Sequence, residues 1–183
     1  MREILSIITK SNKKEELKLK ILDLSYLDQI MELQNTIVQG IENKEWYCEV
    51  SKEEFKSYFS EGKKVLGYLN EEDKLVALGI YIKNGYDKDN YGHDIGLEGE
   101  DLLKVAQIEV TIVLDEYRGN KLQRILCENI EEIARKDKME ILAATASPYN
   151  IYSVRNFESL GYSIEKDKIK YGGMRRYVLV KRI

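Results

Sequence analysis

The sequence predicts an α/β fold (α+β in some schemes) with a mixed, mostly antiparallel central sheet and helices on both faces. Two observations predict this class. Apolar runs over 105–114 and 140–145 flank an amphipathic helix pattern over 120–136, and such a strand–helix–strand unit should form a right-handed parallel crossover. Consecutive strand patterns precede this unit and a closing pair follows it, which favours antiparallel hairpins on either side.

Each element follows from a local pattern. We expect strands where apolar and polar residues alternate or where an apolar run ends in turn residues, and helices where apolar residues recur every three or four positions. A capping-box start at Ser51–Glu54 begins one short helix, and Gly161 ends another. In chain order, the expected elements are a strand over 17–22, helices over 25–40 and 51–59, strands over 64–69 and 75–83, a loop over 84–99, a strand over 105–114, a helix over 120–136, a strand over 140–145, a helix over 151–160, and strands over 162–170 and 175–183.

Length and composition narrow the classes of function. A chain of 183 residues should form a single domain spanning 1–183. Its 29 basic and 32 acidic residues give a net charge of −3, which argues against a nucleic-acid binder. Two distant cysteines, Cys48 and Cys127, favour a reducing compartment, and the single His93 cannot build a zinc site, so we expect no metal. No apolar stretch is long enough for a membrane span or a signal peptide, and we expect a cytoplasmic protein.

The stretch from Val113 to Gln123 carries the strongest functional signal. A strand runs through a short turn into a helix, and a helix start presents unpaired backbone N–H groups with partial positive charge. Arg118, Gly119 and Lys121 lie at this start, so the segment should bind phosphate oxygens. The alternative is an ordinary surface helix start with a scattered arginine and lysine.

Two motifs resemble the GNAT N-acyltransferase superfamily, which uses acetyl-CoA or a related acyl-CoA. The first is the strand-ending Val113 followed by Glu116-Tyr117-Arg118-Gly119, where the family has Glu-Tyr-Arg-Gly-x-Gly-x-Gly. The second runs from Asn150 through Ser153 to residues 157–162, where the family has Asn-x-x-Ala-x-x-x-Tyr-x-x-x-Gly-Phe. The resemblance extends from Val105 to the end of the chain and implies a GNAT-like acyl-CoA N-acyltransferase fold.

The sequence departs from the family pattern at four positions. Asp115 replaces the usual loop proline, Lys121 a glycine, and Gln123 a glycine or alanine. A lysine in the first helical turn needs no special backbone angles, and its ammonium should partner a diphosphate, so we interpret the site as modified rather than lost. Phe157 replaces the tyrosine that protonates the leaving thiolate in many relatives.

The resemblance also implies the coenzyme-binding residues. The diphosphate should lie on backbone N–H groups at 118–123, the pantetheine arm against Asn150, and the acyl oxygen near the N–H of Val113. Together the predicted coenzyme-binding residues are Val113, Arg118, Gly119, Asn120, Lys121, Leu122, Gln123, Asn150, Ser153 and Asn156.

Glu109 is the best candidate for a catalytic base. Alternation along its strand predicts Gln107, Glu109 and Thr111 on one face, and three polar residues on one face of a central strand favour a watered cleft. The alternative is a solvated stretch of strand. Tyr152, the candidate acid, and Tyr149 have phenols suited to protonating a thiolate, but taken alone each better fits an ordinary packing or surface tyrosine, and CoA thiolate is a leaving group good enough to need no dedicated acid.

The leading interpretation is an N-acyltransferase that transfers an acetyl group from acetyl-CoA, or another acyl group from its CoA thioester, to a primary amine by direct attack. A non-catalytic acyl-CoA-binding or regulatory module is the main alternative, favoured by the departures at Lys121, Gln123 and Phe157. A nucleotide-binding α/β domain of another kind lacks the expected glycine motifs. We expect an amine-bearing small molecule or peptide as acceptor and neither nucleic acid nor membrane as partner; the sequence leaves a homodimer open.

Overall fold

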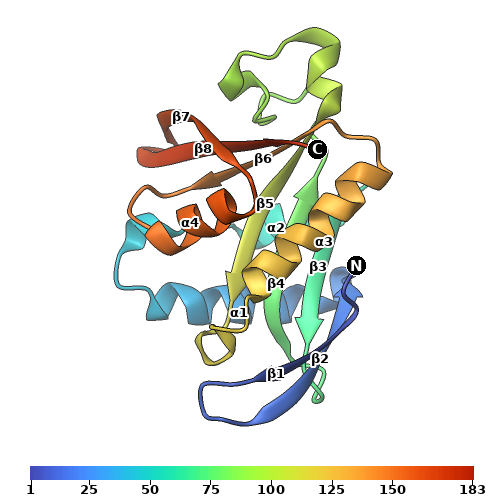
Figure 1. The fold of residues 1–183 in the computed structure, drawn as a ribbon, viewed down its shortest axis with the longest axis vertical. Coiled ribbons are helices and arrows are strands. Elements are labelled where there is room, and N and C mark those ends of the chain that lie inside the picture. Colours follow the sequence, from blue (N-terminus) through green and yellow to red (C-terminus); the bar gives the residue numbers. More distant parts are fainter.

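The computed structural model describes residues 1–183. An eight-stranded sheet runs through the chain in the order β1-β2-β3-β4-β5-β6-β8-β7 (Figure 1). The helices and strands are β1 (Ile4–Ile8), β2 (Lys14–Ile21), α1 (Leu27–Gly40), α2 (Lys52–Ser57), β3 (Lys63–Leu69), β4 (Leu75–Ile82), β5 (Val105–Val113), α3 (Leu122–Lys136), β6 (Ile141–Ala146), α4 (Ile151–Ser159), β7 (Ser163–Lys170) and β8 (Met174–Arg182).

The sheet is mixed and mostly antiparallel, which confirms the predicted fold class. Only β5 and β6 pair in parallel, and α3 makes the crossover between them. The predicted elements end within three residues of the observed bounds, but strand β1 was not predicted. Ile7 in β1 is buried whereas Ile4 and Ile8 are exposed, so apolar residues lie on both sides of this edge strand and hide its alternation.

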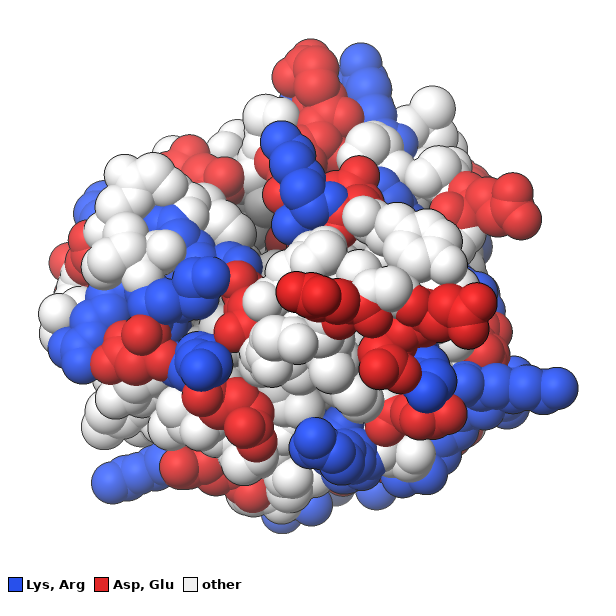
Figure 2. Space-filling view, turned by 90° about the horizontal axis from the view of Figure 1, so that it is seen from above, with Lys and Arg blue, Asp and Glu red and all other residues white.

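Helices cover both faces of the sheet (Figure 1). Helices α1 and α2 pack on one face against a core that includes Leu78, Val110 and Ile112. Helices α3 and α4 pack on the other face against a core that includes Ala106 and Ile108. None of the helices has the length and apolarity needed to cross a membrane. On the side seen in Figure 2, acidic and basic side chains are interspersed, and no extended basic surface is visible there.

A bulge in the middle of β5 changes which side chains share a face. Pairing with β4 shifts by one residue between Gly79↔Thr111 and Tyr81↔Ile108. Ile108 therefore packs toward α3, whereas Val110 packs toward α1, although strict alternation would put both on one face. The prediction that Gln107, Glu109 and Thr111 share a face was wrong for Thr111, which points to α3 and accepts a hydrogen bond from its Gln123.

Strands β5 and β6 separate beyond the bulge. Their parallel pairing runs only from Val105↔Ile141 to Ile108↔Ala144, after which the two strands diverge toward their carboxyl ends (Figure 1). A cavity of about 870 Å³ occupies the opening, lined by the second half of β5, the start of α3, the end of β6 and the start of α4. Ligands commonly bind at the carboxyl ends of parallel strands, which makes this opening the candidate site.

Candidate active site

The start of α3 presents a row of free backbone donors to the cavity. No backbone N–H from Gly119 to Arg124 donates a hydrogen bond to another group of the protein, and the first helical bond is Ile125 N–H to Lys121 O. Gly119 and Lys121, which precede the helix, both line the cavity. Unpaired N–H groups at a helix start, pointing at open space, suit an anion with several oxygens.

The backbone at Lys121 differs from the prediction. The helix begins at Leu122 rather than at residue 120, and Lys121 is its N-cap with φ 59° and ψ 22°, in the left-handed region. The expectation that a lysine here needs no special backbone angles was therefore wrong. Gly119 also has a positive φ, 90°, and left-handed residues are a feature of the turns in which successive N–H groups form an anion-binding concavity.

Basic side chains surround this row of donors, but most already have acidic partners. Lys10 Nζ lies 2.7 Å from a carboxylate oxygen of Asp115, and Arg118 Nη1 lies 3.3 Å from the other. Arg124 pairs with Glu128 at 2.9 Å. Lys121 makes no ion pair, so its ammonium is free to approach a bound anion.

Asn120 has a different role from the other predicted coenzyme-binding residues. Its Nδ2 donates to Ile8 O at 2.8 Å, and its Oδ1 accepts from the N–H of Ile8, so the side chain joins α3 to β1. Asn120 is not among the residues that line the cavity.

Helix α4 supplies polar groups to the opposite wall. Asn150 is its N-cap, and its Oδ1 accepts from the N–H of Ser153 at 3.1 Å, leaving Nδ2 free. Gln123 of α3 reaches across and donates to Ser153 Oγ at 3.3 Å. The Nδ2 of Asn156 is buried without any hydrogen-bond partner. Because an unpaired buried amide is costly, its position in the cavity lining indicates a place for a ligand acceptor.

The backbone of β5 also contributes a donor. The N–H of Leu114 bonds to Val76 O of β4. Successive residues of a strand point their N–H groups to opposite sides, so the N–H of Val113 points away from β4, toward the side that β6 has left open. This geometry fits the predicted donor to an acyl oxygen.

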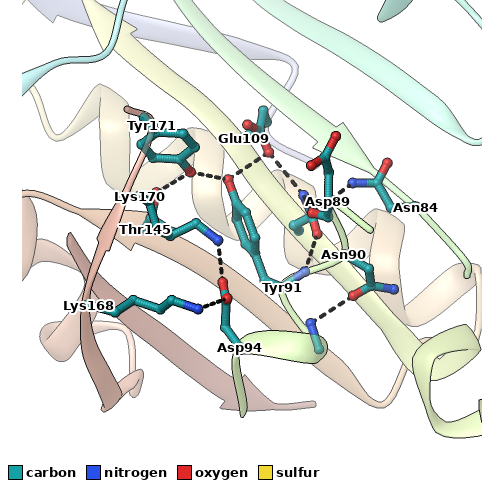
Figure 3. A network of polar contacts seen from close by, with 12 residues as sticks. Asn84, Asp89, Asn90, Tyr91, Asp94, Glu109, Thr145, Lys168, Lys170 and Tyr171 are labelled. Atoms are coloured by element: carbon teal, nitrogen blue, oxygen red, sulfur yellow. Dashed lines mark hydrogen bonds and ion pairs between the residues drawn. The ribbon is translucent and has the colours of Figure 1, made fainter. Parts of the chain in front are cut away.

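Glu109 lies at the other end of the cavity in a network of hydroxyl groups (Figure 3). Its Oε2 accepts from Tyr91 Oη at 2.9 Å and from Gln107 Nε2 at 3.0 Å, whereas Oε1 accepts from no protein group. Tyr91 Oη lies 2.6 Å from Tyr171 Oη, which lies 3.0 Å from Thr145 Oγ1. Since Tyr91 donates to the carboxylate, Tyr171 donates to Tyr91 and Thr145 donates to Tyr171.

Burial controls the protonation of this network. Burial raises the pKa of the Glu109 carboxyl above its usual value, and the hydrogen bonds from Tyr91 and Gln107 only partly oppose this shift. Burial also raises the pKa of Tyr91 and of Tyr171, and the nearby Glu109 charge adds to both shifts. The two phenols therefore remain protonated donors, and Glu109 is the group of this network that can exchange a proton.

Sequence reasoning missed Tyr91, Tyr171 and Thr145. Tyr91 lies in the predicted loop, which Lys168 and Lys170 of β7 hold in place through Asp94 (Figure 3). Tyr171 belongs to the turn before β8 and has φ 50°. Neither position carries a local signal, because the network forms only when the loop and the turn meet over β5.

Eleven of the twelve predicted site residues line one cavity. Asn120 is the exception; the others are Glu109, Val113, Arg118, Gly119, Lys121, Leu122, Gln123, Asn150, Tyr152, Ser153 and Asn156. Tyr152 is 74% exposed at the start of α4, and Tyr149 nearby is 49% exposed, so neither phenol is fixed by packing. Phe157 is buried in the core beside Tyr162.

These features define a mixed α/β protein with a large cleft where two parallel strands separate. The chain belongs to the acetyltransferase (GNAT) family, whose model matches residues 27–162. The match begins well before Val105, where the sequence motifs start, and includes α1 and α2. No curated protein sequence matches the chain significantly.

Solved structures share the fold at low sequence identity. A putative acetyltransferase from Acinetobacter baylyi superimposes with a TM-score of 0.70 and 13% identity, covering 92% of this chain and 93% of that one. The ribosomal-protein-S18-alanine N-acetyltransferase from Escherichia coli gives 0.67 and 15%, covering 91% and 94%. A putative acetyltransferase from Salmonella typhimurium, solved with its cofactor acetyl-CoA, gives 0.66 and 16%, covering 91% and 93%. At these identities the similarity shows the fold alone.

Proposed function

We propose that the protein is an N-acyltransferase that transfers the acetyl group of acetyl-CoA to a primary amine by direct attack. One observation carries this proposal: the free N–H row from Gly119 to Arg124 and the carboxylate of Glu109 line the same cavity. Acetyl-CoA fits such a cavity, because its diphosphate can bind the N–H row while its thioester lies near the proton acceptor that serves the attacking amine.

The residues of the cavity fit the parts of the coenzyme. The N–H groups at 119–124 bind the diphosphate, with Lys121 and Arg118 beside it. The free Nδ2 atoms of Asn150 and Asn156 donate to carbonyl groups of the pantetheine arm. The N–H of Val113 donates to the thioester oxygen and stabilises the negative charge that develops there.

The proposed chemistry needs one base and one acid. Acetyl-CoA supplies an acyl carbon activated as a thioester. Glu109 takes a proton from the attacking ammonium through its free Oε1, so that the nitrogen lone pair can form the new C–N bond, and the nitrogen gives up its second proton to water once that bond has formed. As the C–S bond breaks, Tyr152 donates its phenolic proton to the departing sulfur, and its exposed hydroxyl regains a proton from water.

Calorimetry with acetyl-CoA, followed by a thiol-release assay over a panel of amines, tests the proposal. We expect binding and acceptor-dependent release of CoA. Gly119→Ala is a suitable variant, because φ 90° strains any side chain there and should distort the N–H row. Gly96→Ala is its matched control, since Gly96 also has a positive φ, 81°, but lies in the 84–99 loop away from the row. Absence of binding to any acyl-CoA would overturn the proposal.

A non-catalytic acyl-CoA-binding module is the second candidate. The engagement of Lys10 and Arg118 by Asp115, at the place where the family usually has proline, favours it. Buried Phe157 in place of the usual acid also favours it. Tight binding without thiol release across the panel would support this candidate, and measurable turnover would remove it.

A further inference from the structure

The end of the cavity near Glu109 has walls from three separate segments. Residues 46–50 and Glu54 of α2 form one wall, β5 contributes Glu109, and Tyr171 and Arg176 close the space from the side of β8. None of these residues belongs to the N–H row or to α4. This end of the cavity, hereafter the acceptor end, is therefore where the molecule that meets the acyl group should bind.

Arg176 is the most unusual residue at the acceptor end. It is only 3% exposed, yet it lines the cavity. Its Nη1 donates to Arg175 O at 2.9 Å and its Nη2 to Met174 Sδ at 3.1 Å, and its Cζ lies 5.8 Å from the centre of the Tyr171 ring. A thioether is a weak acceptor, so most of the guanidinium N–H groups lack a good partner.

No carboxylate of the protein pairs with Arg176. Its sequence neighbour Arg175 shows the usual arrangement, with Nη2 2.5 Å from Asp167 on the protein surface. Three acidic residues line the acceptor end, and none forms an ion pair with Arg176: Glu54 accepts from Tyr58 Oη at 2.8 Å, Glu109 accepts from Tyr91 and Gln107, and Glu49 is exposed. A buried cation without a counter-ion is destabilising, and proteins keep such groups mainly where a ligand supplies the negative charge.

The fold directs Arg176 toward the cavity. Val178 and Val180 of β8 belong to a small core that also contains Tyr91, and alternation puts Arg176 on this same face. Tyr171 connects Arg176 with Glu109. The Tyr171 ring lies beside the guanidinium, and the Tyr171 hydroxyl is hydrogen-bonded to Tyr91, which donates to Glu109. A cation and a proton acceptor thus lie in one cavity, separated by two tyrosine side chains.

Cys48 lies near Arg176 in the same cavity. Burial raises the pKa of the Cys48 thiol, and the charge of Arg176 acts in the opposite direction. Cys48 and Arg176 both line the acceptor end, Cys48 from the segment 46–50 and Arg176 from β8.

We infer that Arg176 binds a carboxylate of the acceptor, so that the acceptor is a small molecule carrying both an amine and a carboxylate, an amino acid. This inference rests on the proposed function and specifies its substrate class. The planar guanidinium holds the carboxylate through paired N–H···O bonds, and the amine of the same molecule then lies toward Glu109, which accepts its proton.

Matched acceptors test the inference by thiol release. Each amino acid of a panel is compared with its methyl ester and with the amine that lacks the carboxylate, and glycine, β-alanine and γ-aminobutyrate vary the spacing of the two groups. We expect kcat/KM to be about 10- to 100-fold higher for the best acid than for its ester, the range for a hydrogen bond to a charged group, with most of the difference in KM. Equal turnover of acids, esters and simple amines would overturn the inference.

Variants at two adjacent positions separate binding from folding. Arg176→Gln should remove the preference for acids through KM, and Arg176→Lys should restore part of it, whereas Arg175→Gln should leave it unchanged. The calorimetric affinity for acetyl-CoA should be the same in all four proteins. If Arg176→Gln lowers the affinity for acetyl-CoA or the melting temperature, the acid preference is judged from Arg176→Lys, which keeps the positive charge. An unchanged acid preference in both Arg176 variants would overturn the inference.

Direct binding makes the test independent of turnover. With CoA saturating, the wild type should bind N-acetyl amino acids but not their methyl esters, and Arg176→Gln should bind neither. Failure of the wild type to bind any N-acetyl amino acid would overturn the inference, whereas failure to bind acetyl-CoA would overturn the proposed function itself. A preference for succinyl-CoA over acetyl-CoA that disappears in Arg176→Gln would also overturn the inference, because it would place the carboxylate on the acyl group.

Discussion

Tyr91 donates a hydrogen bond from its hydroxyl to Oε2 of Glu109 across 2.9 Å, from a loop that precedes β5 to the middle of that strand. Gln107 donates to the same oxygen, so both fixed donors lie on one side of the carboxylate. The other oxygen, Oε1, therefore remains the acceptor that a ligand can reach. The arrangement orients Glu109 as a positioned base with a raised pKa, a combination typical of catalytic carboxylates.

Replacing Glu109 by glutamine should remove the base while keeping the shape of the site. We expect kcat/KM for the amine acceptor to fall by about 100-fold or more, the usual contribution of general-base catalysis, with unchanged affinity for acetyl-CoA. In the wild type, activity should rise with pH through the raised pKa of Glu109, and this limb should disappear in the variant. Glu53→Gln, on the exposed side of α2, is the control. A variant that retains wild-type kcat/KM would show that Glu109 is not the base.

The same substitution should change how stability depends on pH. The pKa of Glu109 is higher in the folded protein than its unfolded value near 4.5, so the folded state binds the proton more tightly. Stability should therefore fall as pH rises from the unfolded value to the folded one, and Glu109→Gln should escape this loss. Melting curves recorded from about pH 4 upward should show the variant gaining on the wild type as pH rises from the unfolded to the folded pKa. A constant difference in melting temperature would contradict the prediction.

The sequence predicts most of the fold because each hairpin and the crossover carry local patterns that agree with the final sheet. It does not predict the bulge in β5, because Glu109, Val110 and Thr111 still alternate polar and apolar in sequence. The bulge arises from pairing with β4, which is a long-range event. Strand β1 escapes prediction for the related reason that an edge strand can be apolar on both sides.

The coenzyme end of the site is predictable in a way that the acceptor end is not. The N–H row and the start of α4 are each continuous in sequence, so short motifs identify them. Glu109 meets Tyr91 and Tyr171 only through tertiary contacts, 18 and 62 residues away along the chain (109 − 91 and 171 − 109). Arg176 has no sequence signal at all, because its lack of an acidic partner becomes evident only in three dimensions.

The left-handed backbone of Lys121 should limit stability. A residue with a Cβ is destabilised by about 1–2 kcal/mol of strain in this region of the backbone. Glycine has no such strain, but it raises the entropy of the unfolded chain, which lowers stability by about 0.4–1 kcal/mol. Lys121→Gly should therefore be more stable than Lys121→Ala by up to about 1 kcal/mol in the free energy of unfolding, because both lose the side chain and only one loses the strain. Urea denaturation checks this difference. Equal stability of the two variants would mean that φ 59° is not maintained in solution.

Substitutions of Asn150 and Asn156 should distinguish effects on stability from effects on coenzyme binding. Asn150 lies at the start of α4 and Asn156 within it, and both line the cavity. Asn150 caps the helix through Ser153 N–H, so Asn150→Ala should lower the free energy of unfolding by about 1 kcal/mol. The Nδ2 of Asn156 has no protein partner, so Asn156→Ala should leave stability unchanged or raise it, because it removes an unsatisfied buried donor. Both variants should weaken acetyl-CoA binding by about 2- to 10-fold, the net value of a neutral hydrogen bond, as measured by calorimetry. An Asn156→Ala variant that unfolds more readily, yet binds acetyl-CoA as the wild type does, would show that this amide serves the fold rather than the ligand.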